Sequence, residues 1–335
     1  VTLTVATLIL GSGYAAQQLR TYSLIKTPMI KFGSYGFYLA RFPSGDEMKE
    51  HKRIVLLGNS VYQYWGVPHE MQKIAEEGSQ PLYFFNMAQV SAGINDYLVQ
   101  LAKIIPQKPD LVVIPYNADT ISRSMPVFRT DSDQMSFDPE VRKILPLSFY
   151  QRHFGYQSAT DAFLSAWIPL KRMDPLIRWE FKLKTLLPAW FINQLSYPHL
   201  NALETATQGL SLTAQQKVRS IGGLTEEDLH PEFEQAFQEL IQIAKRFSTP
   251  LLFIQQETGS QIPPRTLEKI KSMIQAYPRA VYLNLQSFWS QETFVDTAHP
   301  NPKELVPYAQ RHYGAVVTAL EKLKQDSEKE VPHDL

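Results

Sequence analysis

Five short, unbroken apolar segments constrain the fold of this chain more than any other feature of its sequence. They span residues 53–58, 82–87, 110–115, 250–255 and 280–285. Apolar residues follow one another in these segments instead of alternating with polar ones, which is typical of strands that are buried on both faces. The sequence therefore predicts a mostly parallel, five-stranded sheet with helices on both sides.

Segments with helical periodicity lie between these strands, at residues 68–77, 92–105, 232–247, 265–277 and 304–325. Alternation of strands and helices predicts an α/β three-layer sandwich with right-handed crossovers, in which functional residues gather at the carboxyl ends of the strands. Residues 122–223, which are dense in proline and aromatic residues, interrupt the alternation. We expect them to form a helical lid or subdomain inserted into a single domain over residues 21–335, whose charged tail frays from residue 322.

The N-terminal segment carries no charged side chain over residues 1–16, and its first charge is Arg20. This run is shorter than the ~20 residues that span a bilayer. We interpret residues 1–20 as the remnant of a membrane anchor or signal, which would place the domain outside the cytoplasm, in the periplasm or at the cell surface. A buried strand or helix of the fold is the alternative.

Charge and cysteine content exclude several classes of function. Lys and Arg number 33, as do Asp and Glu, so the net charge is zero. This balance argues against a nucleic-acid binder that relies on a basic surface, and a local basic patch is the alternative. The chain has no cysteine, which excludes thiol nucleophiles, zinc–thiolate sites, iron–sulfur clusters and disulfides. The histidines show no paired metal-ligand spacing, so we expect no metal and no cofactor.

Ser60 is the candidate nucleophile. It follows Gly58 and Asn59 directly after the first predicted strand, where it would open a helix and expose its hydroxyl among backbone N–H groups. The alternative role for Ser60 is that of a helix N-cap only. Trp65, five residues further on, would line an acyl or sugar pocket or, alternatively, belong to the core.

An acid–histidine pair lies near the C-terminus, where Asp296 and His299 are three residues apart on one predicted loop. The carboxylate would fix the imidazole tautomer, and the second ring nitrogen would then face a nucleophile. The alternative is a surface turn in which Asp296 caps a helix and His299 is solvated.

Two candidate oxyanion donors follow the second and third predicted strands. The backbone N–H of Gly93 and the side-chain amide of Asn117 would each donate a hydrogen bond to an oxyanion. The alternatives are a turn glycine with positive φ at Gly93 and a turn residue bonded to its own backbone at Asn117.

The order Ser60, Gly93, Asn117, Asp296-x-x-His299 resembles the SGNH (GDSL-type) hydrolase superfamily, over about residues 52–122 and 250–314. The resemblance implies a flavodoxin-like sheet, a Ser60–His299–Asp296 triad, and an oxyanion hole made by Ser60, Gly93 and Asn117. Departures from the family pattern are Asn59 in place of the usual Asp, Val61 in place of Leu, and Pro115 and Ala118 in place of Gly and Asp.

The resemblance also implies a reaction, namely acyl transfer through an acyl-enzyme on Ser60. An anchor followed by such a domain is similar in layout to the envelope branch of the superfamily, which serves teichoic-acid D-alanylation and alginate-type O-acetylation. Those proteins work beside a membrane-bound O-acyltransferase. We therefore expect O-acyl transfer or ester hydrolysis on a cell-envelope glycan. A lipase-like or small-ester hydrolase, and an inactive scaffold that binds a glycan or a membrane acyltransferase, are the alternatives.

Overall fold

The computed structural model describes residues 50–64, 67–78, 80–88, 92–121, 136, 139–154, 231–259, 261–288, 290, 292–294 and 299–329. The chain divides into two compact units. One comprises residues 43–127 and 202–335, and the other comprises residues 1–42 and 128–201. The predicted strands and the described candidate site residues all belong to the first unit.

The first unit contains a sheet of five parallel strands in the order β2-β1-β3-β4-β5. This is the flavodoxin-like order of doubly wound sheets, in which the crossover direction reverses between β1 and β3. The sheet confirms the predicted parallel architecture, and its strands are β1 (Lys52–Leu56), β2 (Leu82–Asn86), β3 (Leu111–Tyr116), β4 (Leu251–Gln255) and β5 (Ala280–Asn284).

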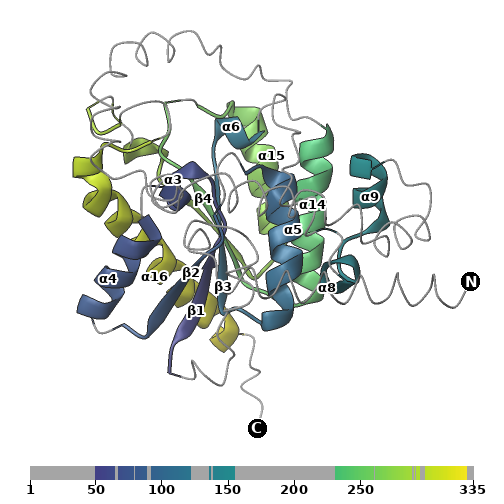
Figure 1. Ribbon diagram of the computed structural model, residues 1–335, viewed down its shortest axis with the longest axis horizontal. Coiled ribbons are helices and arrows are strands. Elements are labelled where there is room, and N and C mark those ends of the chain that lie inside the picture. Colours follow the sequence, from purple (N-terminus) through teal and green to yellow (C-terminus); the bar gives the residue numbers. More distant parts are fainter. Residues whose placement is uncertain are drawn as a thin grey trace, which may run out of the picture. The chain divides into compact units, whose positions relative to one another are not determined.

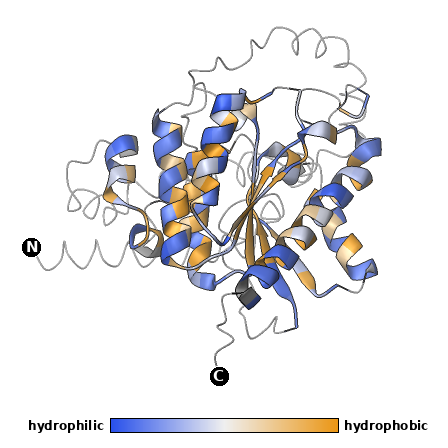
Figure 2. Ribbon diagram, turned by 180° about the vertical axis from the view of Figure 1, so that it is seen from behind, coloured by the Kyte–Doolittle hydropathy of each residue, from blue (hydrophilic) through white to orange (hydrophobic). Residues whose placement is uncertain are grey.

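Burial along the strands explains their unbroken apolar sequences. Every residue of β3 and β4 is buried, whereas the edge strands β2 and β5 are buried only in part. Helices cover both faces of the central strands, so no position along them can carry a polar side chain without a buried partner. Figure 2 shows this pattern, with apolar strands at the centre and hydrophilic outer faces on the helices.

Two groups of helices form the outer layers (Figure 1). One face is covered by α4 (Val67–Glu77) and α16 (Leu305–Lys329), and the other by α5 (Ile94–Ile104), α14 (Pro231–Arg246) and α15 (Pro264–Gln275). Met71 and Val316 belong to the same buried cluster as Leu56. On the opposite face the ring of Phe237 lies 5.1 Å from that of Phe253. The three-layer sandwich is therefore confirmed.

The remaining predictions about organisation have mixed outcomes. Helix α16 continues to Lys329, so the expectation of fraying from residue 322 is wrong up to that residue. The described residues of the 122–223 segment include two helices, α8 (Pro139–Arg142) and α9 (Leu147–Phe154). Residues 1–20 and the rest of 122–223 lie outside the described residues.

Within the described part of the chain, no helix combines the length and the apolar character needed to cross a membrane.

Gly58 allows the close approach that starts helix α3 (Ser60–Tyr64). After β1 ends, the N–H of Leu57 still donates to Val113 O at 3.0 Å, so the turn begins only at Gly58. A Cβ at Gly58 would lie 2.8 Å from Cδ2 of Tyr62, a side chain with no exposed surface. Only glycine leaves room for this ring, which packs directly behind the turn that presents Ser60.

We expect Gly58→Ala to lower the free energy of unfolding by about 1–3 kcal/mol, because the buried Tyr62 ring must shift to admit the methyl group. Urea unfolding measures the change. Gly314→Ala in α16 is the matched control, because no atom lies within 4 Å of its Cβ position. The control should gain roughly 0.5–1 kcal/mol from helix propensity. Equal unfolding midpoints for the two variants would contradict the close-contact explanation.

Candidate functional site

The candidate nucleophile and base lie within hydrogen-bonding distance. Ser60 Oγ is 2.7 Å from His299 Nε2, although 239 positions separate the two residues in sequence. Ser60 is the first residue of α3, directly after the β1 turn, and both side chains are partly buried. The distance suits proton transfer from a serine hydroxyl to a neutral imidazole, provided that Nε2 is the unprotonated nitrogen.

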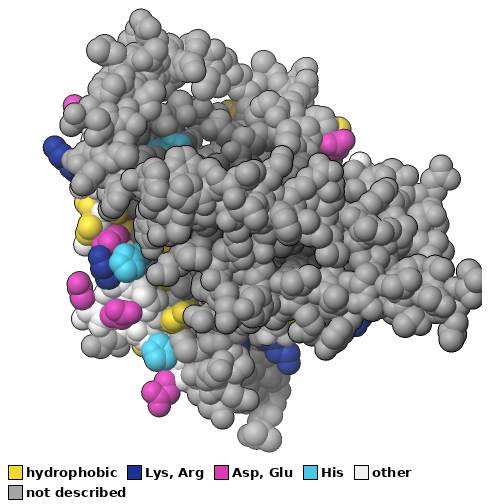
Figure 3. Space-filling view, viewed as in Figure 1, with side chains coloured by type: hydrophobic (Ala, Val, Ile, Leu, Met, Phe, Trp, Pro, Cys, Tyr) yellow, Lys and Arg dark blue, Asp and Glu magenta, His cyan; other side chains and the backbone are white. Residues whose placement is uncertain are grey.

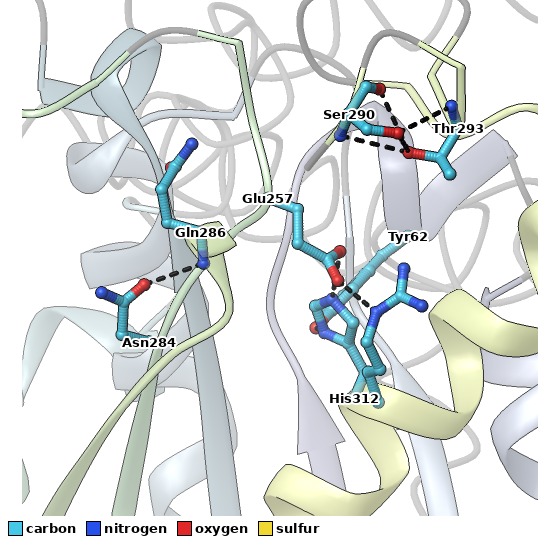
Figure 4. A network of polar contacts seen from close by, with 8 residues as sticks. Tyr62, Glu257, Asn284, Gln286, Ser290, Thr293 and His312 are labelled. Atoms are coloured by element: carbon cyan, nitrogen blue, oxygen red, sulfur yellow. Dashed lines mark hydrogen bonds and ion pairs between the residues drawn. The ribbon is translucent and has the colours of Figure 1, made fainter. Parts of the chain in front are cut away.

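The loop that carries His299 is closed at its base. Phe294 and Pro300 form an antiparallel bridge, and the N–H of Asn301 donates to Thr293 O at 2.7 Å. Thr293 is fixed in turn by Ser290, whose Oγ lies 2.8 Å from Thr293 Oγ1 (Figure 4). The chain is thereby held directly after His299, at Pro300 and Asn301. Asp296, the predicted third member of the triad, lies outside the described residues.

Asn117 lies at the carboxyl end of β3 and is 2% exposed. Its Oδ1 accepts hydrogen bonds from the N–H and the hydroxyl of Thr120, both at 2.9 Å, as expected for a turn residue. Its Nδ2 donates to Oε1 of Gln256 at 3.3 Å. Both roles predicted for Asn117 are compatible, because the turn uses Oδ1 of the amide and a bond to an oxyanion would use Nδ2.

Gln256 was not predicted from the sequence, yet it links two neighbours of the nucleophile. It lies one residue beyond β4, where its N–H donates to Tyr116 O at 2.9 Å. Its Oε1 accepts from Nδ2 of Asn59 at 3.2 Å as well as from Asn117. The sequence did contain a signal for Gln256, because this residue directly follows a buried strand, as Asn117 does.

Gly93 has a different environment from the one expected. It is the N-cap of α5 with φ −109°, so the alternative of a positive-φ turn is wrong. Its N–H donates to Oδ2 of Asp96 at 2.9 Å. This oxyanion donor is therefore already paired with a carboxylate. Trp65, the candidate pocket residue, lies outside the described residues.

A second layer of polar side chains lies behind α3, where Tyr62, Glu257 and His312 point toward one another (Figure 4). The hydroxyl of Tyr62 is 2.6 Å from His312 Nδ1, and Arg311 Nε donates to Glu257 Oε1 at 2.5 Å. His312 Nε2 is 3.7 Å from Glu257 Oε2. Tyr62, Glu257 and His312 have no exposed surface, so this network ties the helix of Ser60 to α16.

Burial keeps the tyrosines of this layer protonated. The pKa of Tyr62 is raised well above its usual value, first by loss of hydration and then by the charge of Glu257. The pKa of Tyr308, whose ring stacks on His312 at 4.4 Å, is raised for the same two reasons. At neutral pH both hydroxyls therefore carry their protons.

On the face that Figure 3 shows, the coloured side chains carry charges of both signs. Acidic, basic and histidine side chains lie intermingled among the residues that Figure 3 colours. Among the described residues, no group of three or more His, Asp or Glu side chains is placed to hold a metal ion.

Neither models of known protein families nor curated proteins gave a match to this chain. The superfamily assignment therefore stays a prediction.

We expect the protein to lose stability as the pH rises above about 10, where tyrosines of the unfolded chain ionise. Tyr62 and Tyr308 stay protonated in the folded state, so the unfolded state binds fewer protons at these pH values. Each such tyrosine lowers the free energy of unfolding by up to ~1.4 kcal/mol per pH unit.

Urea unfolding at several pH values between about 8 and about 11 measures this slope. Tyr62→Phe should make the slope shallower. It also lowers stability by roughly 1–3 kcal/mol at the lower end of this pH range, because His312 Nδ1 loses its partner. An unchanged slope in Tyr62→Phe would contradict the assigned cause.

Proposed function

We propose that this protein is a serine-dependent esterase or O-acyltransferase of the SGNH hydrolase type. The observation that carries the proposal is the 2.7 Å distance between Ser60 Oγ and His299 Nε2. Asn117 and Ser60 follow adjacent parallel strands, β3 and β1, and so lie at the same edge of the sheet. A nucleophile, a base and an amide donor are the groups that acyl transfer requires.

In the proposed first half-reaction, His299 Nε2 takes the hydroxyl proton as Ser60 Oγ attacks an ester carbonyl. The C–O double bond becomes an oxyanion, which the Ser60 N–H and the Asn117 amide stabilise. His299 then returns the proton to the departing alkoxide oxygen as the ester C–O bond breaks. An alcohol leaves, and the acyl group remains on Ser60.

In the second half-reaction, His299 removes a proton from an incoming hydroxyl, which attacks the acyl-enzyme. Collapse of the second tetrahedral intermediate restores the Ser60 hydroxyl with that same proton. Water as the attacking group gives a carboxylic acid and makes the protein an esterase. A sugar or polyol hydroxyl gives a new ester and makes it an O-acyltransferase.

The proposed substrate is an acylated cell-envelope glycan, with the domain anchored outside the cytoplasm beside a membrane-bound O-acyltransferase. The similarity in layout to the envelope branch of the superfamily is the basis for this substrate, partner and location. The mixed surface charge is compatible with a neutral glycan, and binding would then rely on hydrogen bonds and stacking more than on charge.

A scaffold that binds a glycan or an acyltransferase without turnover is the second candidate. One observation favours it specifically, because the Gly93 N–H is paired with the Asp96 carboxylate. A three-donor oxyanion hole would require that bond to break. The enzyme would have to be active with two oxyanion donors, the Ser60 N–H and the Asn117 amide, whereas the scaffold would show no turnover.

We expect a fluorophosphonate probe to label the protein covalently at Ser60, since His299 activates this hydroxyl. Ser60→Ala should abolish labelling, and His299→Ala should slow it by about 10²–10⁴-fold, the usual contribution of a general base. Turnover of p-nitrophenyl acetate should fall in parallel. Intact-mass measurement and ester hydrolysis are the readouts, and a wild type that neither labels nor exceeds Ser60→Ala in turnover would support the scaffold.

We also expect Asn117→Ala to lower kcat by about 10²–10³-fold with little change in KM, because an oxyanion donor acts mainly in the transition state. Asn284→Ala is the matched control, since Asn284 ends β5 on the same edge of the sheet but is exposed. Steady-state ester hydrolysis measures both variants. A loss in KM alone would reassign Asn117 to substrate binding.

A further inference from the structure

We propose that Gln256 is a positioning residue that fixes the amide orientation of Asn59 and Asn117, the two asparagines beside the reacting serine. This inference rests on the proposed function and extends it to Gln256, which is not one of the SGNH motif residues. Gln256 is 1% exposed, and its single Oε1 accepts from both asparagine Nδ2 atoms, at 3.2 and 3.3 Å.

Two backbone groups determine the orientation of the whole network. The N–H of Val61 donates to Asn59 Oδ1 at 3.1 Å, and the N–H of Thr120 donates to Asn117 Oδ1 at 2.9 Å. A backbone N–H can only donate, so each asparagine must turn its oxygen toward it and its nitrogen toward Gln256. Gln256 must then present oxygen, because its own NH₂ would face two other NH₂ groups.

This arrangement makes Asn117 a prepared donor. Each amide nitrogen has two hydrogens, so the bond to Gln256 uses one and leaves the other for an acceptor in the site. Oxyanion donors are effective when they are oriented before charge develops, because no reorganisation is then needed during the reaction. Loss of Oε1 would leave Asn117 held by Thr120 alone.

The backbone of Gln256 is also fixed, through its N–H bond to Tyr116 O at 2.9 Å. Tyr116 directly precedes Asn117, so the β3–β4 ladder sets the spacing between the two amides.

The test compares Gln256→Met with Gln255→Met. Both replace a buried glutamine at the end of β4 by an unbranched side chain, but Gln255 Oε1 accepts, among the described residues, from the Tyr282 hydroxyl at 2.6 Å and not from Asn59 or Asn117. We expect Gln256→Met to lower kcat for p-nitrophenyl acetate by about 10–100-fold with KM unchanged, as a partial loss of the oxyanion donor would do. Gln255→Met should keep the wild-type kcat while losing stability.

A double-mutant cycle separates positioning from general damage. Because Gln256 acts through Asn117, the double variant Gln256→Met/Asn117→Ala should be no slower than Asn117→Ala within a factor of about three. Full addition of the two losses, or a kcat for Gln256→Met equal to that of Gln255→Met, would overturn the inference. Should Gln256→Met fail to fold, Gln256→Asn, whose oxygen is one methylene short of both asparagines, should show the same loss of kcat.

A measurement that does not depend on activity tests the positioning role of Gln256 separately from the proposed enzyme function. The side-chain NH₂ resonances of Asn117, assigned by their absence in Asn117→Asp, should shift in Gln256→Met and stay in place in Gln255→Met. An inactive wild type with this shift would defeat the proposed enzyme and leave the positioning role standing. Unshifted resonances in Gln256→Met would overturn the positioning role even if the wild type is active.

Discussion

Parallel pairing of all five strands is the constraint on which the site depends, because it brings every carboxyl end to one edge of the sheet. Backbone bonds continue this pairing past the strand ends, as between Leu57 N–H and Val113 O, and between Gln256 N–H and Tyr116 O. Neighbouring strands lie about 4.8 Å apart, which is within reach of two side chains. The residues that follow β1, β3 and β4 therefore meet without any long-range adjustment of the chain.

This constraint also explains what could be predicted from the sequence. Continuous apolar runs indicated the strands because burial on two faces leaves no polar alternation, and Ser60 and His299 belong to motifs with a fixed local order. The role of Gln256 could not be predicted, since it depends on which atom of two distant amides faces it. The contact of Glu257 with Arg311 escaped prediction for a related reason, because no local spacing marks two buried polar residues on different elements.

The polar layer behind α3 gives Ser60 a rigid support. Helix α3 has only five residues and cannot hold its own orientation through internal hydrogen bonds. Its first turn is instead fixed by Tyr62, whose hydroxyl lies 2.6 Å from His312 Nδ1 and whose ring packs against Gly58. Buried ionic groups such as Glu257 add little net stability, but removing one partner leaves a buried charge or donor unpaired. The layer therefore favours one position of α3 over others.

The pairing of Gly93 with Asp96 limits how the proposed oxyanion hole would work. Asp96 is 1% exposed, so taking the Gly93 N–H away from its carboxylate would remove a hydrogen bond from a buried charge. An oxyanion at Gly93 would replace one anion by another at the same donor, with the displaced carboxylate still nearby. Both effects oppose a change of hydrogen-bond partner in which the Gly93 N–H leaves Asp96 and donates to a substrate. In the proposed enzyme, the Ser60 N–H and the Asn117 amide would therefore stabilise the oxyanion, and the orientation of the Asn117 amide would matter more than in a hole with a third donor.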